Sequence, residues 1–524
     1  MKKPTSRIQA LAVSSVLVLG SLSAAVNDVF DVYTAVELTN ACAQATFNFN
    51  TIRVHPGVYD LTGMAMKPTT VGTDNKVSTG VTLILSTYGG RLVGTGERPD
   101  DTIIKGGGET DRCQVLSFSK VCTVSNLTFT GGWNANGSGG VASWPNATFT
   151  DCVFSNNYAS GFGGVFDQIT ALTRCRFINN KANCGGVLRP ITDGKKSPTL
   201  VRDCYFEGNT ATESGGICYY GCTWSNCVFV GNSSALGGVF GKSFSFPNVA
   251  TDCRFEGNFA TGSEGGSVAV NNSQVLAAAT NCTFVGNYTP AGSVMVGTGA
   301  ELVNCTLVAN TSMPLVVGAT LKRCTVRGNF GNKGNSNPLL QKCAIYNSLL
   351  AENRAGNHNM SRICSGEGTA LYNCTVVSNV TQASIWSVIT DGAVVNTIFD
   401  ANKVVNSDNT FVKLMDLNAS QLPTAMTNCL WTAQTGTVSG DAVVGGGLVT
   451  ASDLRFSDAT AGDWTLQRKS AARNAGWSDA AYLELVGETD LAGNPRVFSK
   501  DGAKIDVGCY ECCQSTPGLC VIIR

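Results

Sequence analysis

Five polar side chains in the middle of the sequence lie at fixed offsets from cysteines, and their types suit contact with a sugar chain. Each follows a cysteine by one or three residues: Arg176, Tyr205, Glu207, Arg254 and Glu256. If these cysteines begin stacked, equivalent strands, Glu207 and Glu256 are two strand spacings apart, about 9–10 Å. That separation is near the upper end of the range for inverting glycoside cleavage. Arg and Tyr side chains on a flat strand face could also hold sugar rings without any reaction.

Three interpretations of these positions remain open at the level of sequence. Val228 and Val230 lie between the two glutamates, which favours a solvated face with no site. Glycan binding by the arginine and tyrosine side chains is the second interpretation, and hydrolysis by the glutamates is the third. We assign no catalytic residue and no metal ligand, and we treat the five residues as candidates for ligand binding.

The elements that must position these residues are copies of one six-residue motif. Cys-Val-Phe-Ser-Asn-Asn begins at Cys152, and variants begin at Cys175, Cys204, Cys227, Cys253, Cys282, Cys305, Cys324, Cys374 and Cys429, with Leu127, Ser348 and Thr397 in the Cys position of weaker copies. The mean period between the first and last copies is about 25 residues, and insertions fall between motifs rather than inside them. Such a repeat predicts a solenoid.

The spacing inside the motif predicts a strand. Cys and Phe are two residues apart, which places both on the inner face of an extended segment, and the positions between them are expected to face water. The Asn that follows is expected to turn the chain, because Asn tolerates left-handed backbone, and its amide can pair with the next Asn in a stack. A Gly-Gly pair such as Gly163-Gly164 then leads into a second strand. Together these features predict a parallel β-helix in which each strand pairs with the equivalent strand of the next rung.

The stacked cysteines are predicted to be buried thiols, because parallel Cβ vectors do not suit a disulfide. A metal ladder is disfavoured, since His55 and His358 are the only histidines in the chain. The polar position before each Cys, such as Asp151, Arg174 and Asp203, is interpreted as structural, with alternating charge that relieves repulsion. Near the C-terminus, Cys509, Cys512, Cys513 and Cys520 break the pattern and are expected to form disulfides whose pairing is open.

The ends of the chain predict export and a capped solenoid. Residues Met1–Ala25 combine a basic start, an apolar stretch and small residues, as in a cleaved secretory signal. Residues Tyr33–Ala45 form a short amphipathic helix candidate that would cover the open end of the coil, and the segments from Ile52 and Thr102 are expected to be first rungs. His55 is expected to be an outward strand residue rather than a ligand.

Composition narrows the class of protein. The 524 residues carry 37 basic and 37 acidic side chains, so bulk charge disfavours nucleic-acid binding. Only 14% of residues are charged, while 43 are Asn and 59 are Gly, which matches a chain committed to turns and ladders.

Two stretches resemble known families. The Phe-x-x-Asn element with a following Gly-Gly-Val or Gly-Gly-Ile, as in Phe154–Val165 and Phe206–Ile217, resembles the repeats of polymorphic outer membrane proteins. The stretches Gly462–Leu466, Ser470–Gly476, Asp490–Arg496 and Ile505–Glu511 resemble the closing segment of secreted β-helix proteins of the choice-of-anchor Q type. Both resemblances imply a β-helix at a cell surface, and neither implies a reaction.

Pectin-degrading enzymes share the expected architecture, so catalysis is the alternative to weigh. Their hydrolases resemble one another in a Gly-His-Gly and an Arg-Ile-Lys element, and this sequence contains neither. Their lyases need a calcium site of several carboxylates, and the outward positions show no such cluster.

The sequence thus predicts an all-β, right-handed parallel β-helix of the pectin lyase-like type. The expected parts are a signal peptide at 1–25, a cap and first rungs at 26–118, repeats at 119–434 and a C-terminal segment at 435–524. The expected function is a monomeric, secreted or surface-attached display or adhesion rod with polysaccharide or cell-surface glycan partners, no cofactor, no nucleic-acid partner and no transmembrane helix after the signal. A polysaccharide lyase or glycoside hydrolase is the alternative.

Overall fold

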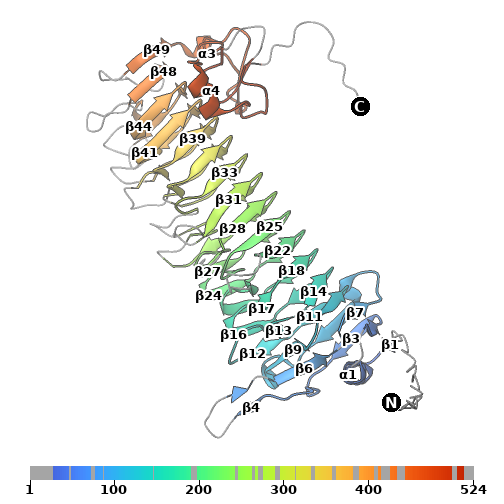
Figure 1. Ribbon diagram of the computed structural model, residues 1–524. Helices are drawn as coiled ribbons and strands as arrows, with labels where there is room; N and C mark the ends of the chain where they lie inside the picture. Colours follow the sequence, from blue (N-terminus) through green and yellow to red (C-terminus); the bar gives the residue numbers. More distant parts are fainter. Residues whose placement is uncertain are drawn as a thin grey trace, which may run out of the picture.

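The chain folds into a right-handed parallel β-helix that runs as a rod from one terminus to the other (Figure 1). A computed structural model describes residues 28–512, apart from 46–48, 72–76, 79, 87, 146, 191–197, 242–245, 263–265, 270–274, 290–295, 313, 332–336, 357–361, 382–388, 406–410, 415–424, 434–442 and 498–503. The signal-peptide prediction, His358, Cys513 and Cys520 lie outside the described residues. Within them, no helix is both long enough and apolar enough to cross a membrane.

One long parallel sheet contains two short strands from each rung. The strands that follow the Cys position are β11 (Thr128–Thr130), β15 (Val153–Ser155), β19 (Arg176–Ile178), β23 (Tyr205–Glu207), β26 (Val228–Val230), β29 (Arg254–Glu256), β32 (Thr283–Val285), β34 (Thr306–Val308), β37 (Thr325–Arg327), β40 (Leu349–Ala351), β42 (Thr375–Val377) and β45 (Ile398–Asp400). The strands that precede it are β10 (Cys122–Ser125), β14 (Ala147–Thr150), β18 (Ala171–Thr173), β22 (Thr199–Arg202), β25 (Cys222–Ser225), β28 (Asn248–Thr251), β31 (Leu276–Thr280), β33 (Glu301–Val303), β36 (Thr320–Lys322), β39 (Ala344–Tyr346), β41 (Cys364–Tyr372) and β44 (Ile389–Val395). The last two strands are β48 (Ala425–Thr432), which contains Cys429, and β49 (Val443–Val449), which stacks on it.

Further faces of the coil come from the strands after the Asn and Gly-Gly positions. A six-stranded sheet contains β12 (Trp133–Asn134), β16 (Tyr158–Phe162), β20 (Lys181–Cys184), β24 (Thr210–Ser214), β27 (Ser233–Leu236) and β30 (Phe259–Ala260), and a three-stranded sheet contains β13 (Ala142–Ser143), β17 (Phe166–Ile169) and β21 (Leu188–Pro190). The Gly-Gly pair turns the chain between them. Gly185 has a φ of +63°, and a Cβ on Gly186 would lie 2.2 Å from the Gly216 carbonyl oxygen of the next rung, so both positions need glycine.

The interior is built from the predicted columns. Seven Phe rings stack with centroids 4.8–5.5 Å apart, and all seven are fully buried: Phe129, Phe154, Phe177, Phe206, Phe229, Phe255 and Phe284. The thiols beside them are free and buried at Cys152, Cys175, Cys204, Cys227, Cys253, Cys282, Cys305, Cys324, Cys374 and Cys429. Each contributes a weak hydrogen bond to a carbonyl, as from Cys152 Sγ to Thr150 O at 3.3 Å. Burial raises the pKa of Cys374 and of Cys429 to about 12.

The Asn column pairs as predicted, but it does not supply the left-handed turn. Each amide side chain is buried and bonds the Asn one rung on; Asn232 Nδ2, for example, donates to Asn258 Oδ1 at 3.0 Å. The positive φ belongs instead to the residue before this Asn, such as Asn179 and Gly231, and to the residue before Cys, such as Asn226. The inward Asn is held in place by its ladder, and its exposed neighbour takes the turn.

The N-terminal end is closed as the sequence predicts. Helix α1 (Ala35–Gln44) begins with a capping box between Thr34 and Glu37, and it buries Leu38, Ala41 and Cys42 against the first rungs. Those rungs contain β1 (Val29–Val32), β2 (Thr51–Val54), β3 (Gly57–Asp60), β7 (Gly90–Gly94) and β8 (Thr102–Lys105), beside the pair β6 (Gly80–Leu85) and β9 (Cys113–Phe118) and the short strands β4 (Thr70–Val71) and β5 (Val77–Ser78). His55 lies at the rod surface, where its Nε2 is 2.7 Å from Asp31 Oδ1 and its ring stacks on Tyr33.

The C-terminal segment packs along the side of the last rungs (Figure 1). It contains α3 (Ala451–Leu454), β50 (Phe456–Asp458), β51 (Asp463–Leu466) and α4 (Ala480–Val486). The expectation that the outward positions face water fails here, because Leu349, Ile398 and Val377 are outward residues buried under this segment. The disulfide expectation is wrong for Cys509, which is a buried free thiol that packs against those residues.

Asparagine side chains in the position before Cys hold this segment on the rod. Asn347 Nδ2 donates to Val486 O at 2.6 Å, Asn373 Nδ2 to Asp506 O at 3.2 Å, and Asn396 Nδ2 to Trp477 O at 2.8 Å. On earlier rungs members of the same column bond one another, as in the pair of Arg174 Nε and Asp151 Oδ1 at 2.7 Å. The column is structural, as predicted, and on the last rungs it also anchors the segment.

Candidate functional site

The five predicted residues lie on one outward face of the long sheet. Arg176 and Tyr205 occupy equivalent positions on neighbouring strands, and Val228 lies between Tyr205 and Arg254 in the same column. The last residues of β23, β26 and β29 form a second outward column: Glu207, Val230 and Glu256. The two glutamates are therefore two rungs apart, about 9–10 Å. The structure therefore places the two glutamates as the repeat predicts.

This face does not bring the two carboxylates into a catalytic arrangement. Glu256 Oε2 is 2.8 Å from Arg254 Nε of its own strand, and Arg176 Nη1 is 3.3 Å from Asp100 Oδ2. Burial and the neighbouring Glu207 raise the pKa of Tyr205, so its hydroxyl stays protonated at neutral pH. Each side chain in these ion pairs is about half exposed, which fits a solvated face.

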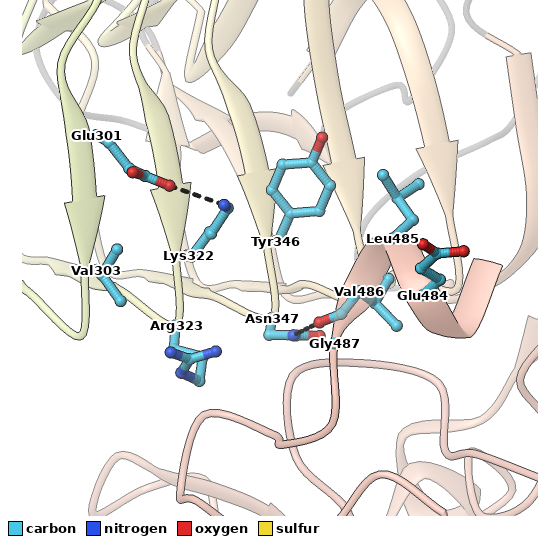
Figure 2. A pocket seen from close by; sticks show the side chains of 10 residues that line it. All are labelled: Glu301, Val303, Lys322, Arg323, Tyr346, Asn347, Glu484, Leu485, Val486 and Gly487. Atoms are coloured by element: carbon cyan, nitrogen blue, oxygen red, sulfur yellow. Dashed lines mark hydrogen bonds and ion pairs between the residues drawn. The ribbon is translucent and has the colours of Figure 1, made fainter. Parts of the chain in front are cut away.

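A cleft lies where the rod meets α4 (Figure 2). It has a volume of about 370 Å³ and is lined by Glu301, Val303, Lys322, Arg323, Tyr346, Asn347, Glu484, Leu485, Val486 and Gly487. Val303, Lys322 and Tyr346 are register partners on β33, β36 and β39, so their side chains point outward at intervals of one rung. Residues 484–487, at the end of α4, form the opposite wall.

Charged groups in the cleft are already oriented. Lys322 Nζ is 2.7 Å from Glu301 Oε1, and both side chains are a little under half exposed (Figure 2). Arg323 Nε donates to Asn304 Oδ1 at 2.8 Å, which fixes the guanidinium at the mouth. An ammonium beside a carboxylate offers donors and acceptors side by side, an arrangement that suits neighbouring hydroxyl groups of a ligand.

Aromatic rings support Tyr346, which is partly exposed in the cleft. The ring of Tyr346 stacks on Tyr372 with centroids 5.1 Å apart, and Tyr372 meets the edge of Tyr482 on α4. Burial, and then the neighbouring Tyr372, raise the pKa of Tyr346, so its hydroxyl is a neutral hydrogen-bonding group at physiological pH. Aromatic packing on both sides of the junction makes Tyr346 a rigid platform.

A buried cluster of polar groups lies beside the cleft and joins the C-terminal segment to Asn347 on the rod wall. Arg496 Nη1 is 2.6 Å from Glu511 Oε1, and Arg496 Nη2 donates to Asn347 Oδ1 at 2.6 Å. Asp506 lies beside this pair, with its backbone N–H donating to Glu511. Burial raises the pKa of Glu511 to about 8 and also raises that of Asp506.

The cleft can bind polar ligands, and its described side chains do not suggest a metal or cofactor. Within the described residues, no group of three or more His, Cys, Asp or Glu side chains is placed to hold a metal ion. The one carboxylate on the rod wall, Glu301, is neutralised by Lys322, which suits hydrogen bonding better than proton abstraction.

Sequence reasoning missed this cleft, although the repeat contains a signal for it. The position two residues before Cys is Ser, Thr or Arg on seven early rungs, at Ser125, Thr150, Thr173, Arg202, Ser225, Thr251 and Thr280. It changes to Val303, Lys322, Tyr346, Tyr372 and Val395 on the following rungs. That change marks where the C-terminal segment approaches the rod.

The fold and cleft define a parallel β-helix with a laterally docked C-terminal segment. No family model and no curated protein matches the chain. Among solved structures, the chain is similar to a PL6 family polysaccharide lyase from Pseudopedobacter saltans, at 11% identity and a TM-score of 0.31 over 79% of this chain and 95% of that one. It is also similar to an alginate lyase in complex with G6, at 9% identity and a TM-score of 0.36 over 87% of this chain and 92% of that one.

A third similar structure is PfbA, a surface adhesin of Streptococcus pneumoniae, at 14% identity and a TM-score of 0.32 over 74% of this chain and 92% of that one. At these values the likeness is one of fold, and the assignment of a β-helix rests on the register of the rungs described above. The resemblances to polymorphic outer membrane protein repeats and to choice-of-anchor Q segments remain predictions.

Proposed function

We propose that the protein is an exported, surface-attached β-helix rod that binds glycans in the cleft beside α4. The observation that carries the proposal is the combination of a supported aromatic ring, Tyr346, with the oriented pair of Lys322 and Glu301. Sugar rings present an apolar face for stacking and hydroxyl groups for charged donors and acceptors, and the cleft offers both within one pocket. Export, surface attachment and a monomeric state follow from the sequence predictions and belong to the proposal.

A glycan-array screen followed by titration of the best ligand tests this proposal. Tyr346→Ala should weaken binding at least tenfold, because it removes the stacking surface, and Lys322→Ala should weaken it by a smaller factor. Thr251→Ala is the matched control. Thr251 lies in the same outward column, three rungs from Lys322, and its replacement should leave affinity unchanged. Unaltered affinity in Tyr346→Ala would refute the cleft as the binding site.

The enzymatic alternative has its own assay. The full chain is incubated with acidic and neutral polysaccharides, and reducing ends and unsaturated products are measured. We expect no turnover, because Glu256 is paired with Arg254 and the two glutamates are two rungs apart. Turnover that is abolished by Glu207→Gln or Glu256→Gln would replace the rod hypothesis with a polysaccharide-active enzyme.

A further inference from the structure

A second face of the rod carries an outward column of aromatic and basic residues. The column runs through twelve consecutive register partners from Trp133 on β12 to Lys403 on β46 (Lys403–Val405). Trp133 follows Gly132, and each of the other eleven residues follows a buried ladder Asn. Five of the twelve are aromatic, three are Lys or Arg, and none is Asp or Glu. In a chain of zero net charge, this column is locally positive.

The aromatic members of the column present ring surface to solvent. Tyr288 is 50% exposed and Phe259 is 37% exposed, and the two are partners on adjacent rungs. The rings of Trp133 and Tyr158 lie with centroids 4.3 Å apart and planes tilted by 36° near the N-terminal end of the same column. Large apolar side chains exposed in one row, rather than singly, indicate an interaction surface.

Basic side chains occur at three positions among these rings along the axis. Lys181 follows Tyr158, and Arg354 follows Phe330, with its guanidinium carbon 6.0 Å from the centre of the Phe330 ring. The outward positions beside Lys181 and Phe259 are uncharged, at Asn183 and Thr261. Glu213, on β24, accepts a hydrogen bond from Asn183 Nδ2 at 3.2 Å, and Glu352, two residues before Arg354, is paired with Arg327.

We propose that this column binds an acidic, uronate-containing polysaccharide laid parallel to the rod axis. Sugar faces stack on the exposed rings, and carboxylates of the chain meet Lys181, Arg354 and Lys403, which supplies charge complementarity. Phe259 and Arg354 are four rungs apart, about 19 Å, so the surface suits an extended oligosaccharide rather than a single sugar. The inference rests on the proposed function only in taking the ligand to be a glycan, and it uses a different face.

Calorimetric titration of the full chain with hexagalacturonate, and with neutral cellohexaose, tests the inference. We expect hexagalacturonate to bind, to lose affinity as salt rises, and to bind at least tenfold more weakly to a Phe259→Ser, Tyr288→Ser double variant. Serine already occupies this column at Ser233, so the variant should fold, and circular dichroism checks it. Arg354→Gln should reduce the salt dependence.

Two control variants separate this inference from the cleft. Tyr88→Ser alters a tyrosine that is 50% exposed and lies outside the column, and it should leave hexagalacturonate binding unchanged. If Tyr346→Ala abolishes this binding while the double variant does not, the inference is refuted and the cleft proposal stands. The reverse result supports the column and refutes the cleft as the hexagalacturonate site. Equal affinity for cellohexaose would refute the acidic class of ligand.

Discussion

At the scale of single residues, the rod depends on side chains that are paired rather than merely buried. Asn232 donates from Nδ2 to Phe206 O and Asn258 Oδ1, and its own Oδ1 accepts from the backbone and side chain of Asn209, all at 3.0 Å. Every group in this unit is out of contact with solvent. An amide in this ladder therefore has no water to replace a lost partner.

Replacement of one ladder amide should be costly. Asn232→Ala removes the acceptor of the backbone N–H and of one side-chain N–H of Asn209, and at roughly 1–3 kcal/mol for each unsatisfied group the loss is about 2–6 kcal/mol. Urea unfolding measures this difference. The control, Asn226→Ala, alters an exposed Asn in left-handed backbone and should cost roughly 1–2 kcal/mol. Equal losses would mean that the ladder contributes no more than the turn.

At the scale of elements, the repeat predicts the rungs, because one motif determines both the number of residues per rung and which residues face inward. Cys152 and Phe154 lie where a two-residue period puts them, and the register of β15 and β19 follows from stacking equivalent motifs. The docking of residues 450–512 was not predictable in this way, because it depends on long-range contacts such as Arg496 with Asn347. The aromatic column was not predicted, because the residue after the ladder Asn varies among aromatic, basic and small polar side chains from rung to rung.

Docking of the C-terminal segment should weaken as pH rises. The pKa of Glu511 is about 8 in the folded state, above the ordinary value of about 4.5, so the folded state holds the proton more tightly than the unfolded state. The stabilisation is complete below about pH 4.5 and is lost as pH rises towards 8. Hydrogen exchange of residues 450–512 at pH 5.5 and 8.5 measures it, with faster exchange expected at the higher pH relative to the intrinsic rate.

Glu511→Gln provides the control for this effect. The amide keeps the shape of the carboxyl group but does not titrate, so the pH dependence of exchange in the C-terminal segment should be smaller than in the parent protein. Amides of the Phe206 and Phe229 rungs report on the rod itself. A pH dependence as large in the variant as in the parent would assign the effect to another group.

At the scale of the whole molecule, the rod is close to a one-dimensional stack. Phe177 contacts Phe206, and Phe206 contacts Phe229, through the same ring geometry, with interplanar angles of 6° and 11°. Because each rung presents the same columns to both neighbours, stability is approximately a sum of rung and interface contributions. The two proposed glycan surfaces lie on different faces of this stack, so its length sets how far a bound chain can extend.

A rung should therefore be removable as a unit. Deletion of residues 204–226 joins Asp203 to Cys227, and the new neighbours repeat the existing pairs, since Tyr205 and Val228 occupy equivalent register positions. We expect a folded rod that is shorter by about 4.8 Å, the spacing of one strand, with a modest loss of stability. Small-angle scattering measures the length and thermal unfolding measures the stability. Deletion of residues 204–215 alone puts the Cys, Phe and Asn columns out of register, and it should abolish cooperative unfolding; if both deletions behave alike, the rungs are not independent units.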